Sequence, residues 1–451
     1  MINIPYIYDL KNRISSDDFI QTIACSVPII LLIGYNSFFN VVLVLYTLFI
    51  SLKLNSKVLF YVYIFMSFFE EVTIVNFLGG SISRIIMIVL IFKLASSIYR
   101  NKYEINMKLL AILLYFILSC VMGWIFNRVN FADISILLNV IVILLYGDYI
   151  YHYKQDERVS IIKVLKKIIV YGVFIAILYG FAHFAFIQEV TANLTNLRFK
   201  GTYEPNFMSL FINIGLSILL FDKDNIFQFK ERFLLMIFFV IALWMTVSIT
   251  GILVFVAVLL YYLYVKNKCY IRKTIINYKK IIILIALLLV STGIAGFTYL
   301  EVISRSQHEP ITEKETNNRF LFLYETLKKG DLNTFTSGRI SLMEDFYRAS
   351  IDRNVFEMAL GNGPSTKVVY SNFFQKDKFA HNTYLDFLYS FGIVGFIVNM
   401  IYIIKVLQRN TFLGIKLDHN DSITILRYVY ITFGMALSLY SKRVVFLFFL
   451  I

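Results

Sequence analysis

Charged residues are scarce in this chain of 451 residues. Lys, Arg, Asp and Glu together make up 16% of it, whereas hydrophobic residues make up 59% and the mean hydropathy is +0.71. Soluble proteins carry a charge on about a quarter of their residues. This composition excludes an ordinary soluble domain and indicates a polytopic membrane protein.

Cysteine is also rare. The three cysteines, Cys25, Cys120 and Cys269, lie far apart, two of them in apolar runs and the third in a basic loop. This spacing provides neither a disulfide framework nor a metal site. The 43 basic residues outnumber the 29 acidic ones, but they lie in short clusters between apolar runs. That pattern is typical of the positive-inside rule, so we expect no nucleic-acid partner.

Long hydrophobic runs dominate the chain instead. A helix needs about 20 apolar residues to cross the hydrocarbon core, and we count roughly 12 to 14 such runs. Their continuous apolar character favours helices over a barrel, whose strands alternate. The sequence therefore predicts an all-α, polytopic transmembrane bundle. The expected spans are 19–34, 38–52, 58–75, 82–99, 108–126, 131–150, 168–188, 205–221, 233–248, 250–265, 281–300, 383–404 and 426–441, with a short apolar tail at 444–451.

The basic clusters also predict the orientation of the chain. With the N-terminus in the cytoplasm, every second loop is rich in Lys and Arg, as expected for cytoplasmic loops. The longest of the other loops is 301–382, which we place outside the cytoplasm. It separates two membrane parts, 1–300 and 383–451.

One part of the long loop has a helical pattern. Between Ser337 and Ile351, apolar residues recur at helical spacing at Ile340, Met343, Tyr347 and Ile351. This predicts an amphipathic helix that lies over the bundle, with Thr336 or Ser337 as its N-cap.

Polar residues gather where the long loop meets the next span. His381 and Asn382 stand at this boundary between water and lipid. An unperturbed imidazole has a pKa of about 6.5, so His381 suits a general base. Its alternative role is that of a polar residue that helps to start a helix. Gly361 and Gly363, in Gly-Asn-Gly-Pro, indicate a turn upstream of it.

A second polar group precedes the span 205–221. Arg198 is a fixed charge whose fork of donors suits phosphate, and Glu204 and Asn206 follow it closely. Arg339, near the start of the amphipathic helix, is able to supply a second guanidinium. In the alternative interpretation, Arg198 is an ordinary loop charge and Arg339 belongs to a solvated helix surface.

Three further patterns are weaker. Glu70-Glu71 is able to act as a loop acid, although two carboxylates at the end of a span are usually interfacial charge. Asp222-Lys-Asp224 matches the D-x-D metal motif of nucleotide-sugar transferases, but no α/β domain surrounds it. His183 would suit a proton relay in a transporter, whereas a hydrogen-bonded histidine in a helix is the simpler interpretation. We therefore expect no metal.

Several short motifs follow one another in a defined order. Together they resemble the O-antigen polymerase and O-antigen ligase superfamily, over roughly Tyr171 to Ile404. The motifs are Arg198-x-x-Gly201-x-x-Glu204-Pro205-Asn206, Ser337-Gly338-Arg339, Gly361-x-Gly363, Ala380-His381-Asn382-x-Tyr384-Leu385 and Gly392-Ile-Val-Gly395. The sequence departs from the family once: after Thr246-Val-Ser248 the family often has arginine, whereas this chain has Ile249. That departure puts a further arginine contact with the donor in doubt.

The resemblance implies a glycosyltransferase of the bacterial inner membrane, with its active site facing the periplasm or cell exterior. Such an enzyme would use undecaprenyl-diphosphate-linked repeat units, without metal or cofactor. Carried over by position, Arg198 and Arg339 would hold the diphosphate, and His381 would orient or deprotonate the acceptor hydroxyl. The other residues that the resemblance assigns to the diphosphate or glycan are Glu204, Asn206, Asn382, Gly361 and Gly363.

Within this superfamily we predict a repeat-unit polymerase for an O-antigen or capsule type of polysaccharide. The abundance of Ile, Phe, Tyr, Asn and Lys resembles polymerases of glycan clusters. A chain-length regulator and a flippase of the same pathway would be its partners, beside membrane lipids. A ligase that moves the finished glycan to lipid A-core or another terminal acceptor is the alternative enzyme. A lipid-linked oligosaccharide flippase or other transporter is the alternative from another class, but a transporter should carry charge within its spans.

Overall fold

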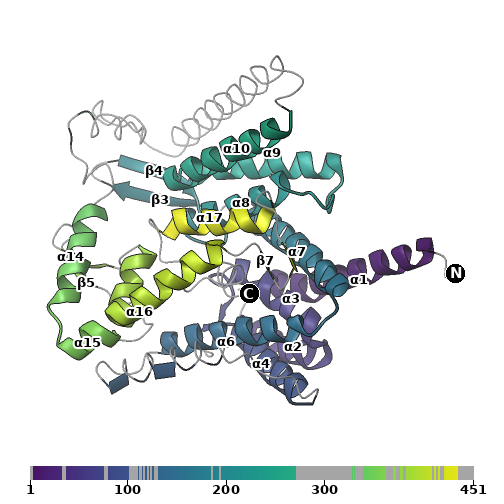
Figure 1. Cartoon of the computed structure of the whole chain (residues 1–451), viewed down its shortest axis with the longest axis horizontal. Helices are drawn as coiled ribbons and strands as arrows, with labels where there is room; N and C mark the ends of the chain where they lie inside the picture. The colour runs from purple at the N-terminus through teal and green to yellow at the C-terminus, as the bar shows by residue number, and fades with distance from the viewer. Residues whose placement is uncertain are drawn as a thin grey trace. The chain divides into compact units, whose positions relative to one another are not determined.

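The computed structural model is mostly helical, as Figure 1 shows. It describes residues 4–32, 37–75, 80–100, 131–183, 186–191, 194–270, 339–361, 369–371, 376–378, 382–408, 411–412, 415–416 and 421–434, with single positions between 110 and 125 and at 328 and 330. The predicted span 281–300, the proposed caps Thr336 and Ser337, and the tail 444–451 lie outside these residues. So do two predicted site residues, Gly363 and His381.

The chain divides into two compact units. The first comprises Met1–Gly172 and Arg339–Ile451, and the second comprises Val173–Gly338. The predicted division at 300 and 382 followed loop length, whereas these units follow packing. Each unit is described by itself.

The first unit contains the N-terminal helices and the helices after the long loop. The N-terminal elements are α1 (Ile4–Leu32), α2 (Ser37–Lys53), α3 (Ser56–Met66), a short 3-10 turn (Ser67–Phe69), α4 (Ser83–Arg100), α6 (Phe131–Tyr151) and the first part of α7 (Gln155–Ala182). The later helices are α14 (Arg339–Ile351), α15 (Val355–Leu360), α16 (Thr383–Gln408) and α17 (Ser422–Gly434). Short antiparallel pairs join β1 (Ile74–Val75) to β2 (Gly80–Ser81), β5 (Val369–Ser371) to β6 (Lys376–Lys378), and β7 (Thr411–Phe412) to β8 (Ile415–Lys416).

Helix α3 forms the core of this unit. The Asn55 side chain caps it by accepting from the backbone nitrogen of Val58 at 2.8 Å. Every residue from Val58 to Met66 is buried, because α1 and α4 pack against this helix. The hydroxyl of Tyr63 donates to Oδ1 of Asn139 on α6 at 2.6 Å, so a buried polar contact joins α3 to α6.

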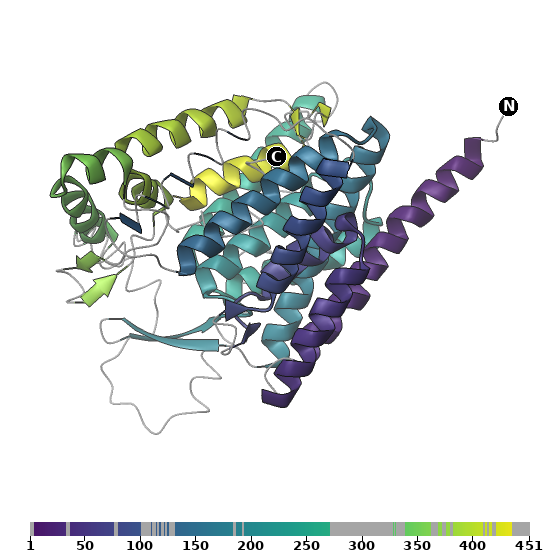
Figure 2. The same cartoon turned by 90° about the horizontal axis from the view of Figure 1, so that it is seen from below.

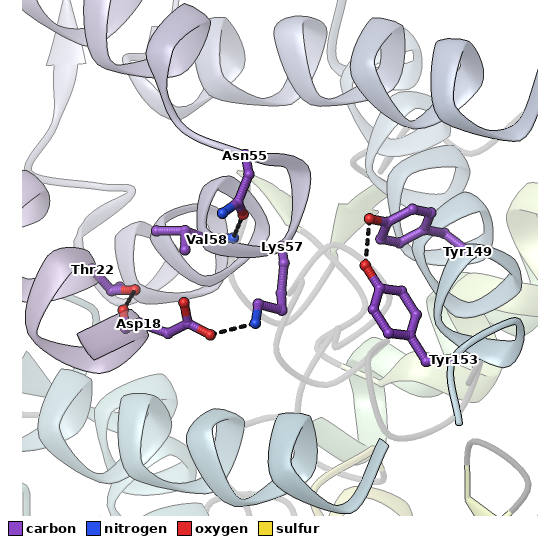
Figure 3. A network of polar contacts seen from close by, with 7 residues as sticks. All are labelled: Asp18, Thr22, Asn55, Lys57, Val58, Tyr149 and Tyr153. Atoms are coloured by element: carbon purple, nitrogen blue, oxygen red, sulfur yellow. Dashed lines mark hydrogen bonds and ion pairs between the residues drawn. The ribbon is translucent and has the colours of Figure 1, made fainter. Parts of the chain in front are cut away.

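Three polar contacts involve residues that the charge pattern places at or near the cytoplasmic side. Asp18 of α1 pairs with Lys57 of α3 at 2.5 Å, and the hydroxyls of Tyr149 and Tyr153 lie 2.5 Å apart at the end of α6 (Figure 3). Lys166 of α7 lies 3.5 Å from Asp421, just before α17. The predicted alternation of the spans stays a prediction.

Two helix ends are capped by basic side chains from a later helix. Lys93 of α4 donates to the carbonyl of Leu52 at 2.8 Å and also to that of Leu54, at the end of α2. Arg427 of α17 donates to the carbonyls of Val406 and Thr411, at 3.0 and 3.1 Å, near the end of α16. The last carbonyls of a helix have no partner within it, so these cations satisfy them.

The second unit contains the end of α7, a β-hairpin and three helices. The hairpin pairs β3 (Phe186–Thr191) with β4 (Leu194–Phe199), and Figures 1 and 2 both show it as a separate ribbon. The helices α8 (Pro205–Leu220), α9 (Phe229–Met245) and α10 (Ile249–Tyr270) pack together. Glycines permit the close approach: a Cβ on Gly215 would lie 2.4 Å from Phe239, and a Cβ on Gly251 would lie 2.6 Å from Ser209.

Several predicted boundaries were wrong. The span 58–75 is replaced by α3, the 3-10 turn and β1, because Glu70 to Thr73 form a turn. The span 168–188 ends with α7 at Ala182, and Phe186–Thr191 form β3 instead of the end of a span and a loop. The helical content agrees with the predicted all-α class, and the four short strand pairs are additions to it.

Only part of the predicted membrane arrangement is supported by helix length. Among the described residues, one helix, α16, is long and apolar enough to cross a membrane. Six others are apolar but shorter: Phe39–Lys53, Ser56–Phe69, Leu138–Tyr151, Pro205–Leu220, Thr250–Val265 and Ser422–Phe433. The polytopic bundle therefore stays a prediction.

Candidate functional site

Arg198 is a buried charge in the second unit. It lies at the end of β4 and is only 2% exposed. Its Nε donates to the carbonyl of Thr246 at 3.0 Å, and its Nη2 donates to Oδ1 of Asn206 at 2.9 Å. A guanidinium is costly to bury without such partners. The structure therefore corrects the alternative of an ordinary solvated loop charge.

Two other predicted site residues lie beside this arginine. Asn206 is in the first turn of α8, where Pro205 occupies the first helical position. Its Nδ2 donates to Oε1 of Glu204 at 3.3 Å, so the amide bridges the carboxylate and the guanidinium. The structure thus brings Arg198, Glu204 and Asn206 together, and their predicted contact with substrate stays a prediction.

The turn between α9 and α10 completes this group. Its Thr246 carbonyl accepts the hydrogen bond from Arg198. Its Ser248 hydroxyl donates to Oδ1 of Asn206 at 3.1 Å. Val247 between them has a φ of 49°. A β-branched residue rarely adopts this left-handed conformation, and such strain is concentrated at functional sites.

Sequence reasoning missed the role of this turn. The sequence analysis named Thr246 and Ser248 only because they precede Ile249, the position at which the family often has arginine. The available signal was the short polar break, Thr246-Val-Ser248, between two apolar runs. A polar break inside apolar sequence marks a place where backbone groups are open to side-chain partners.

The polar contacts continue along α8. Ser209 Oγ lies 3.0 Å from Oγ of Ser248, and Asn213 Nδ2 donates to the carbonyls of Ser209 and Gly251 at 2.8 and 3.0 Å. Ser217 Oγ donates to the carbonyl of Asn213 at 2.8 Å. These side chains share one face of α8 because they are spaced four residues apart. They join α8 to α10 and support the turn that holds Arg198.

The other predicted residues belong to the first unit, where Asn382 has a structural task. Its Oδ1 accepts from the backbone nitrogens of Tyr384 and Leu385, at 2.9 and 3.1 Å. Asn382 is therefore the N-cap of α16, as the sequence predicted for it or Thr383. Its predicted contact with substrate is not tested by this geometry. His381, the residue before it, lies outside the described part of the chain.

Gly361 ends α15 against a break in α16. Helix α16 is interrupted at Gly392, whose φ is 64° and ψ is −173°. A Cβ on Gly361 would lie 2.5 Å from the nitrogen of Gly392 and 2.3 Å from the carbonyl oxygen of Ser390. The backbone at the end of α15 thus touches the backbone at the break in α16, and neither position has room for a side chain.

Arg353 holds the same break from the other side. Its Nη1 donates to the carbonyl of Tyr389 at 2.7 Å, and its guanidinium lies 3.3 Å from the centre of the Tyr389 ring. Burial lowers the pKa of this guanidinium, and Tyr389 and Glu357 oppose the shift. The cation lies at the C-terminal end of the first half of α16, where a positive charge is favourable.

The predicted amphipathic helix is present as α14, but its buried face is not the predicted one. Leu342 and Phe346 are each 1% exposed and pack on Leu385 and Tyr389 of α16. Ile340, Tyr347 and Ile351, which we expected to face the bundle, are exposed. Spacing alone could not choose between the two apolar faces. Arg339 is the first residue of α14, and only its backbone position is described.

The weaker candidates lie in turns or at the end of a helix. Both carboxylate oxygens of Asp222 accept from backbone nitrogens, of Ile226 at 3.0 Å and of Phe227 at 3.1 Å, which suits a turn and not a metal. His183 is exposed just beyond the end of α7, not inside a span. Glu70 and Glu71 lie in the turn after the 3-10 segment. Among the described residues, no cluster of His, Cys, Asp and Glu is able to hold a metal.

Comparison with known proteins identifies one domain. Residues 234–400 match the family described as O-antigen ligase. The match includes Arg339, Gly361, Asn382 and the turn at Thr246, but not Arg198. No curated protein and no solved structure matches the chain. Members of this family are integral inner-membrane enzymes that resemble glycosyltransferases and act on lipid-linked glycans. Over residues 234–400, the match confirms the predicted resemblance to the O-antigen polymerase and ligase superfamily.

Proposed function

We propose that this protein is a polysaccharide repeat-unit polymerase of the plasma membrane. It transfers the growing glycan from undecaprenyl diphosphate to an incoming lipid-linked repeat unit at the outer face. Support comes from the family match, from the outer placement of the polar motifs by the charge pattern, and from the buried arginine group.

The chemistry exchanges one bond at an anomeric carbon for another. A hydroxyl oxygen of the incoming unit forms the new bond, and the bond from that carbon to the diphosphate breaks. The departing undecaprenyl diphosphate takes the electron pair, and the hydroxyl proton passes to His381. The negative charge that develops on the leaving group is what fixed cations are able to stabilise.

The observation that carries this proposal is the way Arg198 is held. Its guanidinium is buried, and the contacts at Nε and Nη2 go to uncharged oxygens of Thr246 and Asn206. A charge held in place and shielded from water acts strongly on a nearby anion and needs little reorganisation during the reaction. Arg339 would supply a second cation for the same diphosphate.

A reconstituted reaction tests the arginine role. Purified protein in liposomes should elongate lipid-linked repeat units, and Arg198→Ala and Arg339→Ala should each abolish or sharply reduce the rate. Lysine at either place should rescue only in part, because a point charge does not replace a bidentate fork. Arg348→Ala, which removes an exposed arginine of α14, is the control. Full activity of Arg339→Ala would remove that residue from the site.

A ligase remains the second candidate because the matching family is described as O-antigen ligase. Deletion of the gene in its host separates the two activities on a gel of the surface glycan. A polymerase mutant should leave the acceptor with a single repeat unit. An acceptor with no repeat unit, together with polymer on the lipid carrier, would instead show the ligase.

A further inference from the structure

Helices α14 and α15 carry apolar side chains that the packing of the unit does not use. Tyr347 and Ile351 are 55% and 50% exposed, and Val355 and Phe356 are 73% and 69% exposed. We call these four residues the outer apolar surface. Single exposed apolar residues are normal, but four along two consecutive helices indicate a partner.

The faces of α14 separate three kinds of surroundings. At about 100° per residue, Ile340, Tyr347 and Ile351 fall within an arc of about 40°. Leu342 and Phe346 lie on a second arc, which packs on α16. Glu344 and Arg348, both exposed, lie on a third arc beside the first. A helix with a protein face, an apolar face and a charged face fits the boundary between a membrane and water.

The contacts of α14 and α15 show which part of α16 they pack against. Phe346 packs on Tyr389 with ring centroids 5.4 Å apart, and Gly361 at the end of α15 touches Gly392. Gly392 comes nine residues after Thr383, so it lies about 14 Å from the start of α16. Among the described residues α16 is the helix that meets the criteria for a span, and α14 and α15 lie beside its N-terminal half, which the charge pattern assigns to the outer side.

The exposed apolar surface of α16 begins where this cover ends. Ile393 and Val394, directly after the break, are 42% and 46% exposed. The exposed residues continue down one side of the helix at Ile397, Val398, Ile401 and Ile404. Before the break, Leu385 and Tyr389 are instead covered by α14. The apolar surface thus passes from the second half of α16 to α14 and α15.

Two polar groups of this segment bind within the protein, whereas Asp352 between them and α14 is exposed and would lie in the headgroup region. Arg353 donates to the carbonyl of Tyr389 and stacks on its ring, so its charge is directed into the protein. Asn354 caps α15 by accepting from the nitrogen of Glu357 at 2.8 Å. Such a cap satisfies the first backbone nitrogens of a helix that enters the hydrocarbon region, where water is scarce.

We propose that α14 and α15 lie in the outer leaflet, with the outer apolar surface in contact with phospholipid acyl chains. This inference rests on the membrane placement in the proposed function, but not on polymerase activity. The long loop would then not be wholly aqueous. Its residues 340–356 would form part of the membrane-embedded surface beside the first half of α16.

Fluorescence in proteoliposomes tests the placement. The full chain, with Cys25, Cys120 and Cys269 replaced by serine, receives one cysteine by Phe356→Cys or, as the matched control on the charged face, by Arg348→Cys. A polarity-sensitive label at 356 should emit at shorter wavelength than at 348. Phospholipids brominated on the acyl chain should quench the label at 356 several-fold more strongly than the label at 348. An impermeant thiol reagent added outside should modify position 348 and spare 356.

Three results would overturn the proposal. Rapid modification at 356 without quenching would place the surface in water. Quenching by a labelled polyprenyl diphosphate, but not by brominated phospholipid, would make it a site for the carrier lipid. Val355→Cys repeats the measurement if Phe356→Cys does not fold, and lack of quenching there has the same meaning. None of these readouts needs catalysis, so an inactive wild-type protein would refute the proposed function alone.

Discussion

Gly361 and Gly392 face each other backbone to backbone. A Cβ on Gly361 would lie 2.5 Å from the nitrogen of Gly392, and a Cβ on Gly392 would lie 2.6 Å from the nitrogen of Gly361. Both residues also have positive φ angles, 77° and 64°. The end of α15 therefore fits the break in α16 only when both positions are glycine, which explains two glycines of the family-like motifs by packing.

Alanine at either glycine should destabilise the protein strongly. Gly330 is the matched control, because its φ is 73° but nothing lies within 4 Å of an added Cβ. Gly330→Ala should cost about 1 kcal/mol from the left-handed backbone alone. Gly392→Ala and Gly361→Ala add a collision with the backbone. The decrease in melting temperature of the purified protein should therefore be several-fold larger than for Gly330→Ala. Equal shifts at 330 and 392 would argue against the contact.

Asn206→Asp should separate charge from shape at Arg198. The new carboxylate would keep the hydrogen bond to Nη2 and would neutralise the guanidinium. We expect at least a tenfold loss of transfer rate, together with a lower thermal stability, because the new carboxylate loses the donor to Glu204 and repels it. Asn354→Asp is the control, since Asn and Asp cap a helix equally well. Near-normal turnover in Asn206→Asp would show that the positive charge of Arg198 is not used.

Ser248 should matter more for activity than a serine of the same network farther from Arg198. Ser248 donates to Asn206 at 3.1 Å, whereas Ser217 donates only locally, to the carbonyl of Asn213. Ser248→Ala should lower kcat by several-fold because Asn206 loses a partner and Arg198 is held less firmly. Ser217→Ala should leave kcat unchanged. The prediction fails if both variants have the same kcat.

His381→Ala should reduce the rate by about 10²- to 10⁴-fold if the imidazole takes the acceptor proton. The wild-type rate should also fall on the acidic side, as the ring becomes protonated. His381→Gln keeps a polar side chain without a base and should not restore the rate. If it matches the wild type, the ring is only positional and the base lies elsewhere.

Cysteine labelling should verify the predicted orientation. In a cysteine-free chain, Lys376→Cys in the long loop should react with an impermeant reagent from outside intact cells. Lys154→Cys, in the exposed turn before α7, should react only after permeabilisation. The opposite labelling would place the loop and its site residues in the cytoplasm.

The sequence predicted helices best where long apolar runs end at polar residues. Helices α4, α6, α8 and α2 begin and end within about two residues of the predicted spans. It failed where a turn lies inside an apolar run, as at Glu70 to Thr73, because hydropathy does not report backbone hydrogen bonding. The hairpin β3–β4 was missed as well, because its apolar and polar residues alternate too little to distinguish a strand from a loop.

The candidate site was predictable as a list of residues but not as an arrangement. Arg198, Glu204 and Asn206 are close in the sequence, so their contact followed from one motif. The carbonyl of Thr246 and the hydroxyl of Ser248 come from a turn about 45 residues away, and pairing across that distance depends on how α8 packs on α10. Likewise, only packing decides which apolar face of α14 is buried.

The capping of α2 by Lys93 and of α16 by Arg427 bears on how the chain is made. In both cases the side chain that completes a helix end is synthesised after that helix. Each helix must therefore wait for a later one before its last carbonyls find a partner, and water or translocation machinery has to satisfy them meanwhile. A nascent chain halted between α2 and α4 should consequently expose an incomplete end of α2, which makes that interval a vulnerable stage of biogenesis.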